Sequence, residues 1–181
     1  MDGYRLRPAR LQEAERLAII KSRYIRSLYR GFLAADYLRE ATPEFYLPEV
    51  TWCMRDEKSH VDVLEIDGQA VGYVIFGIDP GDPGFGLIRE EAILPEYGRR
   101  EKDALVRHAI ERLASLGYMD IHLWVLRDNF RVRFLFESIG FRPDGTVRVE
   151  PRDGLELNIS RYAYRIPATG GGHGLVASIG Q

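Results

Sequence analysis

The sequence has very little of several features that would narrow its role. It has a single cysteine, Cys53, which excludes an intrachain disulfide and a metal site built from cysteine ligands. No apolar run reaches the roughly 18 residues that a membrane-spanning helix needs, so we expect no membrane insertion. The net charge is only −2, and this balance does not favour binding to nucleic acid or to a membrane surface.

Targeting and motif signals are also scarce. Residues 1–5 contain no apolar stretch of the signal-peptide type, so we expect a cytoplasmic protein. The spacing of the four histidines resembles no metal motif, and we predict no metal site. The P-loop, dinucleotide and Gly-x-Ser-x-Gly motifs are all absent. What is present is an ordinary globular composition, 45% hydrophobic and 29% charged, over a length of 181 residues that suits one domain.

The spacing of the apolar residues predicts a mixed α/β domain. Alternation predicts strands at residues 4–7, 61–66, 70–78, 87–94, 121–125, 141–149 and 155–166. Asp67-Gly68 is a hairpin-turn signature between the second and third strands, and residues 151–154 predict a turn between the last two. Helical spacing predicts helices at residues 11–29, 42–54 with an interruption at Pro48, 100–116 and 130–139. We therefore expect one domain over residues 1–167, with a sheet of about seven strands flanked by about four helices. Residues 168–181 are rich in glycine and predict a flexible tail, with at most a weak strand at 175–179.

Residues 121–142 are the most informative stretch of the chain. An alternating strand leads to Asn129, which is a good helix cap because its side-chain oxygen accepts an orphan backbone N–H. An apolar face follows at helical spacing, and Gly140 then ends the helix before Phe141. This order of strand, Asn, helix with aromatic residues and Gly-Phe resembles the C-terminal half of the GNAT superfamily of N-acetyltransferases.

The order of elements over residues 4–166 is also similar to that family. The resemblance implies a mixed, mostly antiparallel GNAT-like sheet covered on both faces. It implies an acyl-CoA-dependent N-acetyltransferase, with acetyl-CoA as co-substrate and a primary amine of a small molecule or peptide as acceptor. By analogy alone, because family members often dimerise through late strands, we also expect a homodimer.

Members of the family bind the pyrophosphate of acetyl-CoA with a Gly-rich loop at a helix N-terminus, where backbone N–H groups form an anion site. The corresponding loop here begins at Pro95 and keeps only Gly98, and carboxylates stand in the first turn of the helix. From these residues alone, a solvated helix start without a ligand explains the loop equally well. The resemblance instead implies a phosphate site with contacts from Arg99, Arg100 and Lys102.

The family usually has a tyrosine that protonates the departing thiolate, at the position of Phe136 here. Phe136 has no proton to give, and its helical spacing also explains it as a core residue. Water can protonate a CoA thiolate, so the substitution does not exclude turnover. The resemblance places Asn129 and Phe136 beside the cofactor arm, although the helix-cap role explains Asn129 fully.

Glu90 and Glu91 are the candidates for the general base. Alternation sends them to opposite faces of their strand, so one of them must point inward or toward a cleft. A buried carboxylate has a raised pKa, which suits a base, although an ion pair with Arg89 explains the residues as well. We prefer Glu91 because it shares a face with Ile93. The resemblance further implies that backbone N–H groups near Ile93 and Leu94 polarise the thioester.

The acceptor is the least constrained part of the prediction. Acidic residues near the expected site would favour a cationic amine, although solvated acidic loops explain them equally: Glu40, Glu44, Asp79 and Asp82. One alternative function is a GNAT-fold binding or regulatory module that has lost acetyl transfer. Another is different chemistry on a CoA-linked or carrier-linked substrate, because fold does not settle function.

Overall fold

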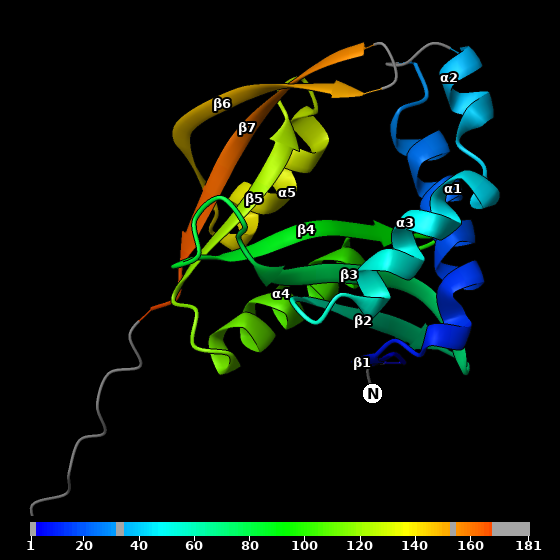
Figure 1. Cartoon of the computed structure of the whole chain (residues 1–181), viewed down its shortest axis with the longest axis horizontal. Helices are drawn as coiled ribbons and strands as arrows, with labels where there is room; N and C mark the ends of the chain where they lie inside the picture. The colour runs from blue at the N-terminus through cyan, green and yellow to red at the C-terminus, as the bar shows by residue number, and fades with distance from the viewer. Residues whose placement is uncertain (1–2, 32–34, 153–154, 168–181) are drawn as a thin grey trace, which may run out of the picture.

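The computed structural model describes residues 3–31, 35–152 and 155–167, and these form one seven-stranded sheet with five α-helices (Figure 1). The strands are β1 Arg5–Pro8, β2 Ser59–Ile66, β3 Gln69–Ile78, β4 Gly86–Ile93, β5 Asp120–Leu126, β6 Arg142–Arg152 and β7 Leu155–Arg165. The helices are α1 Ala14–Leu28, α2 Ala35–Glu40, α3 Pro43–Arg55, α4 Arg99–Ser115 and α5 Phe130–Ile139, with a 3₁₀ turn η1 at Leu11–Glu13. Among these described helices, none is long and apolar enough to cross a membrane.

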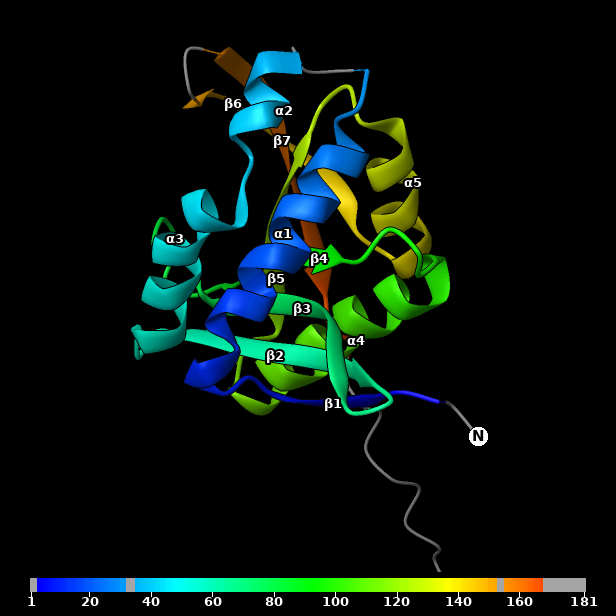
Figure 2. The same ribbon diagram turned by 90° about the vertical axis from the view of Figure 1, so that its right-hand side faces the viewer.

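The strands lie in the order β1-β2-β3-β4-β5-β7-β6, and every neighbouring pair is antiparallel except β4 and β5. Helices α1 and α3 lie over one face of the first half of the sheet, and α4 lies over the other (Figures 1 and 2). Strand β3 is therefore buried at eight of its ten positions. This arrangement confirms the mixed, mostly antiparallel sheet, and the short α2 brings the helices to five.

Several local predictions are confirmed by the backbone. Asp67 and Gly68 both have positive φ, 50° and 78°, as a two-residue hairpin turn between β2 and β3 requires. The Thr42 side chain accepts a hydrogen bond from the Phe45 N–H at the start of α3. Asn129 caps α5, because its Oδ1 atom accepts from the Val132 N–H at 3.2 Å.

Two expectations about proline are wrong. Helix α3 continues through Pro48 to Arg55, because the proline removes only the bond to the Glu44 carbonyl, and Glu44 lies in the exposed first turn. Pro151 lies within β6, opposite Glu156, where a turn was expected. Strand β6 is an edge strand, and an edge strand tolerates a proline on the side that has no neighbour. Residues 153–154 and the predicted tail at 168–181 lie outside the described residues.

A β-bulge in β4 shapes the centre of the molecule. Ile75 of β3 pairs with Glu90, but the next residue, Phe76, pairs with Ile88, so Arg89 is an extra residue without a partner on β3. The parallel pairing of β4 with β5 ends at the same place, at Ile88. A bulge bends its strand and strengthens the local twist. Beyond Ile88 the two strands part, and the sheet is split along the rest of β4.

Candidate active site

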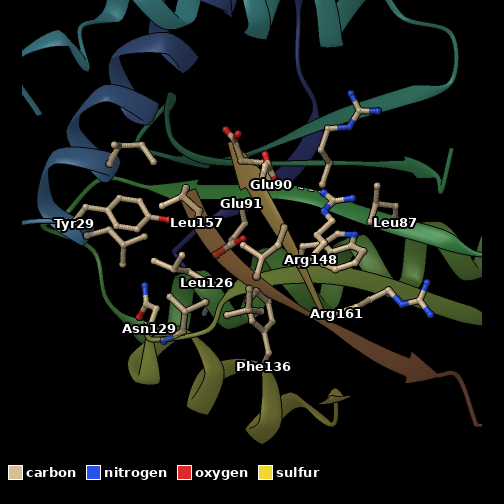
Figure 3. Close-up of a pocket in the computed structure, with 18 of the residues that line it drawn as sticks. Tyr29, Leu87, Glu90, Glu91, Leu126, Asn129, Phe136, Arg148, Leu157 and Arg161 are labelled. Carbon is tan, nitrogen blue, oxygen red and sulfur yellow. Dashed lines mark hydrogen bonds and ion pairs between the residues drawn. The ribbon is translucent and has the colours of Figure 1, made fainter. Parts of the chain in front are cut away.

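A cavity of about 600 Å³ lies at this split between β4 and β5 (Figure 3). Its walls come from the second half of α1, from β4 and β5, from α5, and from the far ends of β6 and β7. In Figure 3, Tyr29 lies toward one end of the view, and Arg148 and Arg161 lie toward the other. Glu90 and Glu91 lie between them and both line the cavity. The two glutamates thus lie in the middle of a site whose walls also include Glu49 of α3 and residues 79–81.

The Glu90 side chain projects from β4 toward α1 and α3. Its Oε2 atom is 2.6 Å from the Nζ atom of Lys21, and its Oε1 atom accepts a hydrogen bond from the Tyr73 hydroxyl. The same Nζ atom is 2.8 Å from Glu49 Oε2. Burial raises the pKa of Tyr73 well above 10, and the charge of Glu90 adds to this. Both oxygens of Glu90 are therefore engaged by the protein itself.

The Glu91 side chain contacts residues of both α4 and α1. Its Oε1 atom is 2.8 Å from the Nζ atom of Lys102 and 3.3 Å from the hydroxyl of Tyr24. Lys102 also donates to the Tyr24 hydroxyl. Burial raises the pKa of Tyr24 well above 10, and the nearby Glu91 charge acts in the same direction. These contacts all involve one oxygen of Glu91, and they place a phenol against it.

The backbone of β4 presents polar groups to the split. The Leu94 N–H donates to the Val71 carbonyl at 2.9 Å, so this N–H is used by β3 and is not directed at a ligand. In an antiparallel pair the polar groups of successive residues point to alternate sides of the strand. The N–H and C=O groups of Glu91 and Ile93 therefore point away from β3, toward the gap where β5 has separated. Of the two expected backbone donors, only Ile93 faces the gap.

The N-terminus of α4 differs from a simple phosphate-binding loop. The Gly98 N–H donates to Glu101 Oε2 at 2.9 Å, so a carboxylate of the protein already occupies this donor. Lys102 points into the cavity region and pairs with Glu91, away from the loop. Arg99 donates to Ser138 Oγ at 2.8 Å, and its guanidinium lies 5.2 Å from the Phe134 ring centre. Arg99 thus connects the start of α4 to the C-terminal half of α5. Arg100 follows it, with its guanidinium 6.0 Å from the Tyr4 ring centre.

Asn129 and Phe136 both line the cavity from α5. Asn129 is 6% exposed, and its oxygen is used by the cap that begins the helix. Phe136 is 2% exposed and packs edge-on against Phe141, with ring centres 5.7 Å apart. The expected structural roles of the two residues, helix cap and core aromatic, are confirmed. Their surfaces also form the floor of the cavity in Figure 3.

The acidic residues that were expected to attract a cationic amine are mostly elsewhere. Of the four, only Asp79 lines the cavity. Asp79 is buried, and its Oδ2 atom is 3.0 Å from His122 Nδ1 while its Oδ1 atom accepts from the Gly81 N–H. His122 stacks on Phe85 at 4.1 Å, so this pair anchors the loop before β4. Asp79 therefore stabilises the loop before β4, and its carboxylate is not an unpaired anion.

Lys21 and Tyr73 escaped the sequence reasoning, and Arg89 was expected only as an ion-pair partner of Glu90 or Glu91, whose ion pairs are with Lys21 and Lys102 instead. The position of Lys21 could have indicated a buried charge, because this lysine lies on the apolar stripe of α1, between Leu17 and Tyr24 at helical spacing. The contacts of Tyr73 and Arg89 could not be predicted from the sequence, because they arise from the pairing of β3 with β4 and from the bulge. Across the described residues, no group of three or more His, Cys, Asp or Glu side chains could hold a metal ion.

Comparisons with known proteins agree with this geometry. The family model of the acetyltransferase (GNAT) family matches residues 23–141. An uncharacterized N-acetyltransferase of Archaeoglobus fulgidus is 32% identical over 129 residues, which are 66% of this chain and 82% of that protein. The L-2,4-diaminobutyric acid acetyltransferase of Nocardia farcinica is 30% identical over 101 residues, which are 55% of this chain and only 52% of that protein.

The fold is also shared with solved structures. The PaiA N-acetyltransferase of Thermoplasma acidophilum, solved in complex with coenzyme A, superposes with a TM-score of 0.65. The superposition covers 89% of this chain and 99% of that one, at 18% identity.

Proposed function

This chain belongs to the GNAT family of acetyltransferases, and from that premise we propose that it transfers the acetyl group of acetyl-CoA to a primary amine of a small molecule or peptide. The observation that carries the proposal is the split of β4 from β5, with two glutamates and open backbone groups on its edge. The diaminobutyric acid acetyltransferase, whose name gives an amine-bearing acceptor for that protein, supports the choice of acceptor.

We assign the role of base to Glu91. Both oxygens of Glu90 are engaged, whereas the contacts of Glu91 involve one oxygen, so its other oxygen faces fewer competitors. The amine nitrogen attacks the thioester carbon, the new N–C bond forms as the C–S bond breaks, and the proton of the amine passes to Glu91. The thiolate of CoA leaves and takes a proton from water, because Phe136 has none to give, and Tyr24 lines the cavity in contact with Glu91.

The extended arm of acetyl-CoA fits the open edge of β4. An amide-bearing chain that lies in the gap can hydrogen-bond to the backbone of Glu91 and Ile93 as an added strand would. The N–H of Ile93 is then the backbone donor nearest to the thioester in this proposal, since that of Leu94 is used by Val71. Arg99 and Arg100 stand where the phosphates would leave the gap, at the first turn of α4.

Calorimetric titration with acetyl-CoA and, in parallel, with CoA tests the proposal. We expect micromolar binding that weakens about tenfold in Arg99→Ala and in Arg100→Ala, because each variant loses a charge-assisted contact. Arg107→Ala is the matched control, since Arg107 lies on the same helix two turns away and pairs with Asp103 on the surface. Wild-type protein that binds neither ligand at millimolar concentration would sink the proposal and favour a binding module.

Dimer formation stays a prediction, and β6 is where we place it. This strand is at the edge of the sheet, and its Val147 and Val149 are 61% and 52% exposed. Two copies that pair at this edge would cover those side chains. Size-exclusion chromatography with light scattering gives the molar mass directly, and a value near the 20.7 kDa of one chain at micromolar concentration would exclude the dimer.

A further inference from the structure

The cavity extends beyond the two glutamates to a wall of guanidinium groups. Arg89 comes from β4, Arg148 from β6 and Arg161 from β7, and all three line the same cavity. Figure 3 labels Arg148 and Arg161. Arg148 and Arg161 stand over the ring of Trp124, with their guanidinium carbons 4.0 Å and 6.0 Å from its centre. This part of the cavity is thus lined by guanidinium groups as well as by carboxylates.

Each carboxylate that lines the cavity already has a partner within the protein. Glu49 and Glu90 share Lys21, and Glu91 pairs with Lys102. The remaining pairs are Asp79 with His122 and Glu150 with Arg148. An acceptor with only a positive charge therefore meets no carboxylate that lacks a partner.

Arg89 differs from the other two arginines. Arg161 is 2.6 Å from Asp144 and Arg148 is 3.3 Å from Glu150, but Arg89 makes no ion pair with a carboxylate anywhere in the described part of the chain. Its guanidinium has the Trp52 ring at 5.5 Å and the Cys53 thiol at 3.8 Å. This leaves a planar, bidentate donor group at the cavity wall without an anion.

The bulge places Arg89 beside the reacting centre. Side chains of neighbouring strand residues normally point to opposite faces, but the extra residue of a bulge breaks this alternation. Arg89 contacts Cys53 of α3, and Glu90 contacts Lys21, which also binds Glu49 of α3, so both side chains lie on the α1 and α3 side of β4. Their Cα atoms are about 3.8 Å apart, so a compact molecule can reach both.

We propose, resting on the acetyl-transfer function above, that the acceptor is a small amine that also carries a carboxylate. The carboxylate binds the guanidinium of Arg89, the lining arginine that has no carboxylate partner among the described residues. The amine then lies at the glutamates of β4, where Glu91 takes its proton. Arginine suits this role because its fork of N–H groups matches the two oxygens of a carboxylate.

The test compares matched amines with and without the carboxylate. The acceptors are L-2,4-diaminobutyrate, L-lysine and L-methionine, each beside its α-carboxamide, which keeps the α-amine and removes the only carboxylate. Release of CoA thiol gives kcat/KM for each. With wild-type protein we expect at least one acid to exceed its carboxamide about tenfold or more, the effect of one charge-assisted contact.

Variants then assign the preference to Arg89. We expect Arg89→Gln to remove the preference by raising the KM of the acid, to leave the carboxamide unchanged, and to leave acetyl-CoA binding by calorimetry unchanged. Arg89→Lys should keep part of the preference, because it retains the charge but not the fork. Arg55→Gln, on the exposed last residue of α3, is the matched control.

The outcomes separate this inference from the function on which it rests. Carboxamides that react as well as the acids would overturn the inference and leave the transferase intact. The same holds if Arg89→Gln slows both members of a pair equally, or if acetyl-CoA binds but no acid in the panel is acetylated. Absence of acetyl-CoA binding is a different result, and it overturns the proposed function itself.

Discussion

Lys21 is a buried cation on which two carboxylates depend, and replacing it with methionine tests how the site is held together. The Lys21 side chain is 3% exposed, and its Nζ atom contacts Glu90 Oε2 at 2.6 Å and Glu49 Oε2 at 2.8 Å. Burial lowers the pKa of Lys21, but the two carboxylates outweigh it, and the pKa lies above its ordinary value. Methionine has nearly the same length and fills the space, so Lys21→Met removes mainly the charge.

The expected cost follows from what is left behind. Removing one partner of a fully buried ion pair costs about 3–5 kcal/mol, because the other charge stays buried without compensation. The Glu90 side chain is 24% exposed and that of Glu49 is 53% exposed, so water recovers part of this. We expect Lys21→Met to lower the free energy of unfolding by about 2–3 kcal/mol at pH 7. For a domain of this size, that corresponds to roughly 4–12 °C in Tm.

Urea unfolding followed by circular dichroism measures this loss. If the unpaired charge of Glu90 is the cause, adding Glu90→Gln to Lys21→Met should restore about 1 kcal/mol or more, because the buried anion is then gone. Lys58→Met, in an exposed turn, is the matched control and should change little. The reasoning is refuted if Lys21→Met costs less than about 1 kcal/mol, or if the second substitution only adds a further loss.

Three further predictions concern the reaction, the fold and the pH response. Glu91→Gln should lower kcat about 10²- to 10⁴-fold in the thiol-release assay, and a loss below about tenfold would remove Glu91 from the role of base. Asn129→Ala should cost about 1 kcal/mol in urea unfolding through loss of the α5 cap, whereas Asn129→Asp should not. The pKa of Tyr73 is raised by burial and then by Glu90, so the unfolded chain releases this proton near pH 10 while the folded protein keeps it. Unfolding free energy should therefore fall as the pH rises past about 10, and equal slopes for wild type and Tyr73→Phe in urea titrations at pH 8 to 10.5 would contradict this.

The elements were predictable where a local rule decides the structure. Asn129 and Gly140 bound α5 because a side-chain cap and a glycine with φ 124° are local devices. Asp67-Gly68 formed the hairpin turn for the same reason. The local rules failed at Pro48 and Pro151. Helix α3 tolerates Pro48 because the carbonyl that loses its hydrogen bond is exposed to water, and β6 tolerates Pro151 because an edge strand has no neighbour on one side. Neither condition is visible in the residues nearby.

The position of the site could be predicted from the sequence, but the contacts between its side chains could not. Glu90 and Glu91 line the cavity as a strand at residues 87–94 suggested, and they have different ion-pair partners, Lys21 and Lys102. Lys102 was expected at phosphate and instead reaches Glu91, since a long side chain on the first turn of α4 can extend either way. The acidic residues near the expected site suggested a cationic acceptor, but the carboxylate of Asp79 is paired with His122. Which charges remain without partners is a property of the folded chain.

The bulge at Arg89 connects these features through one physical cause. A regular β4 would pair with both β3 and β5, and every backbone group along it would be satisfied. Because the bulge bends the strand after Ile88, the polar groups of Glu91 and Ile93 face a gap and require a partner. The same extra residue brings the Arg89 guanidinium to the face that holds Glu90. One irregularity therefore opens the edge proposed to receive the acyl donor and turns a positive charge toward the proposed acceptor, so the two halves of the site depend on one short stretch of strand.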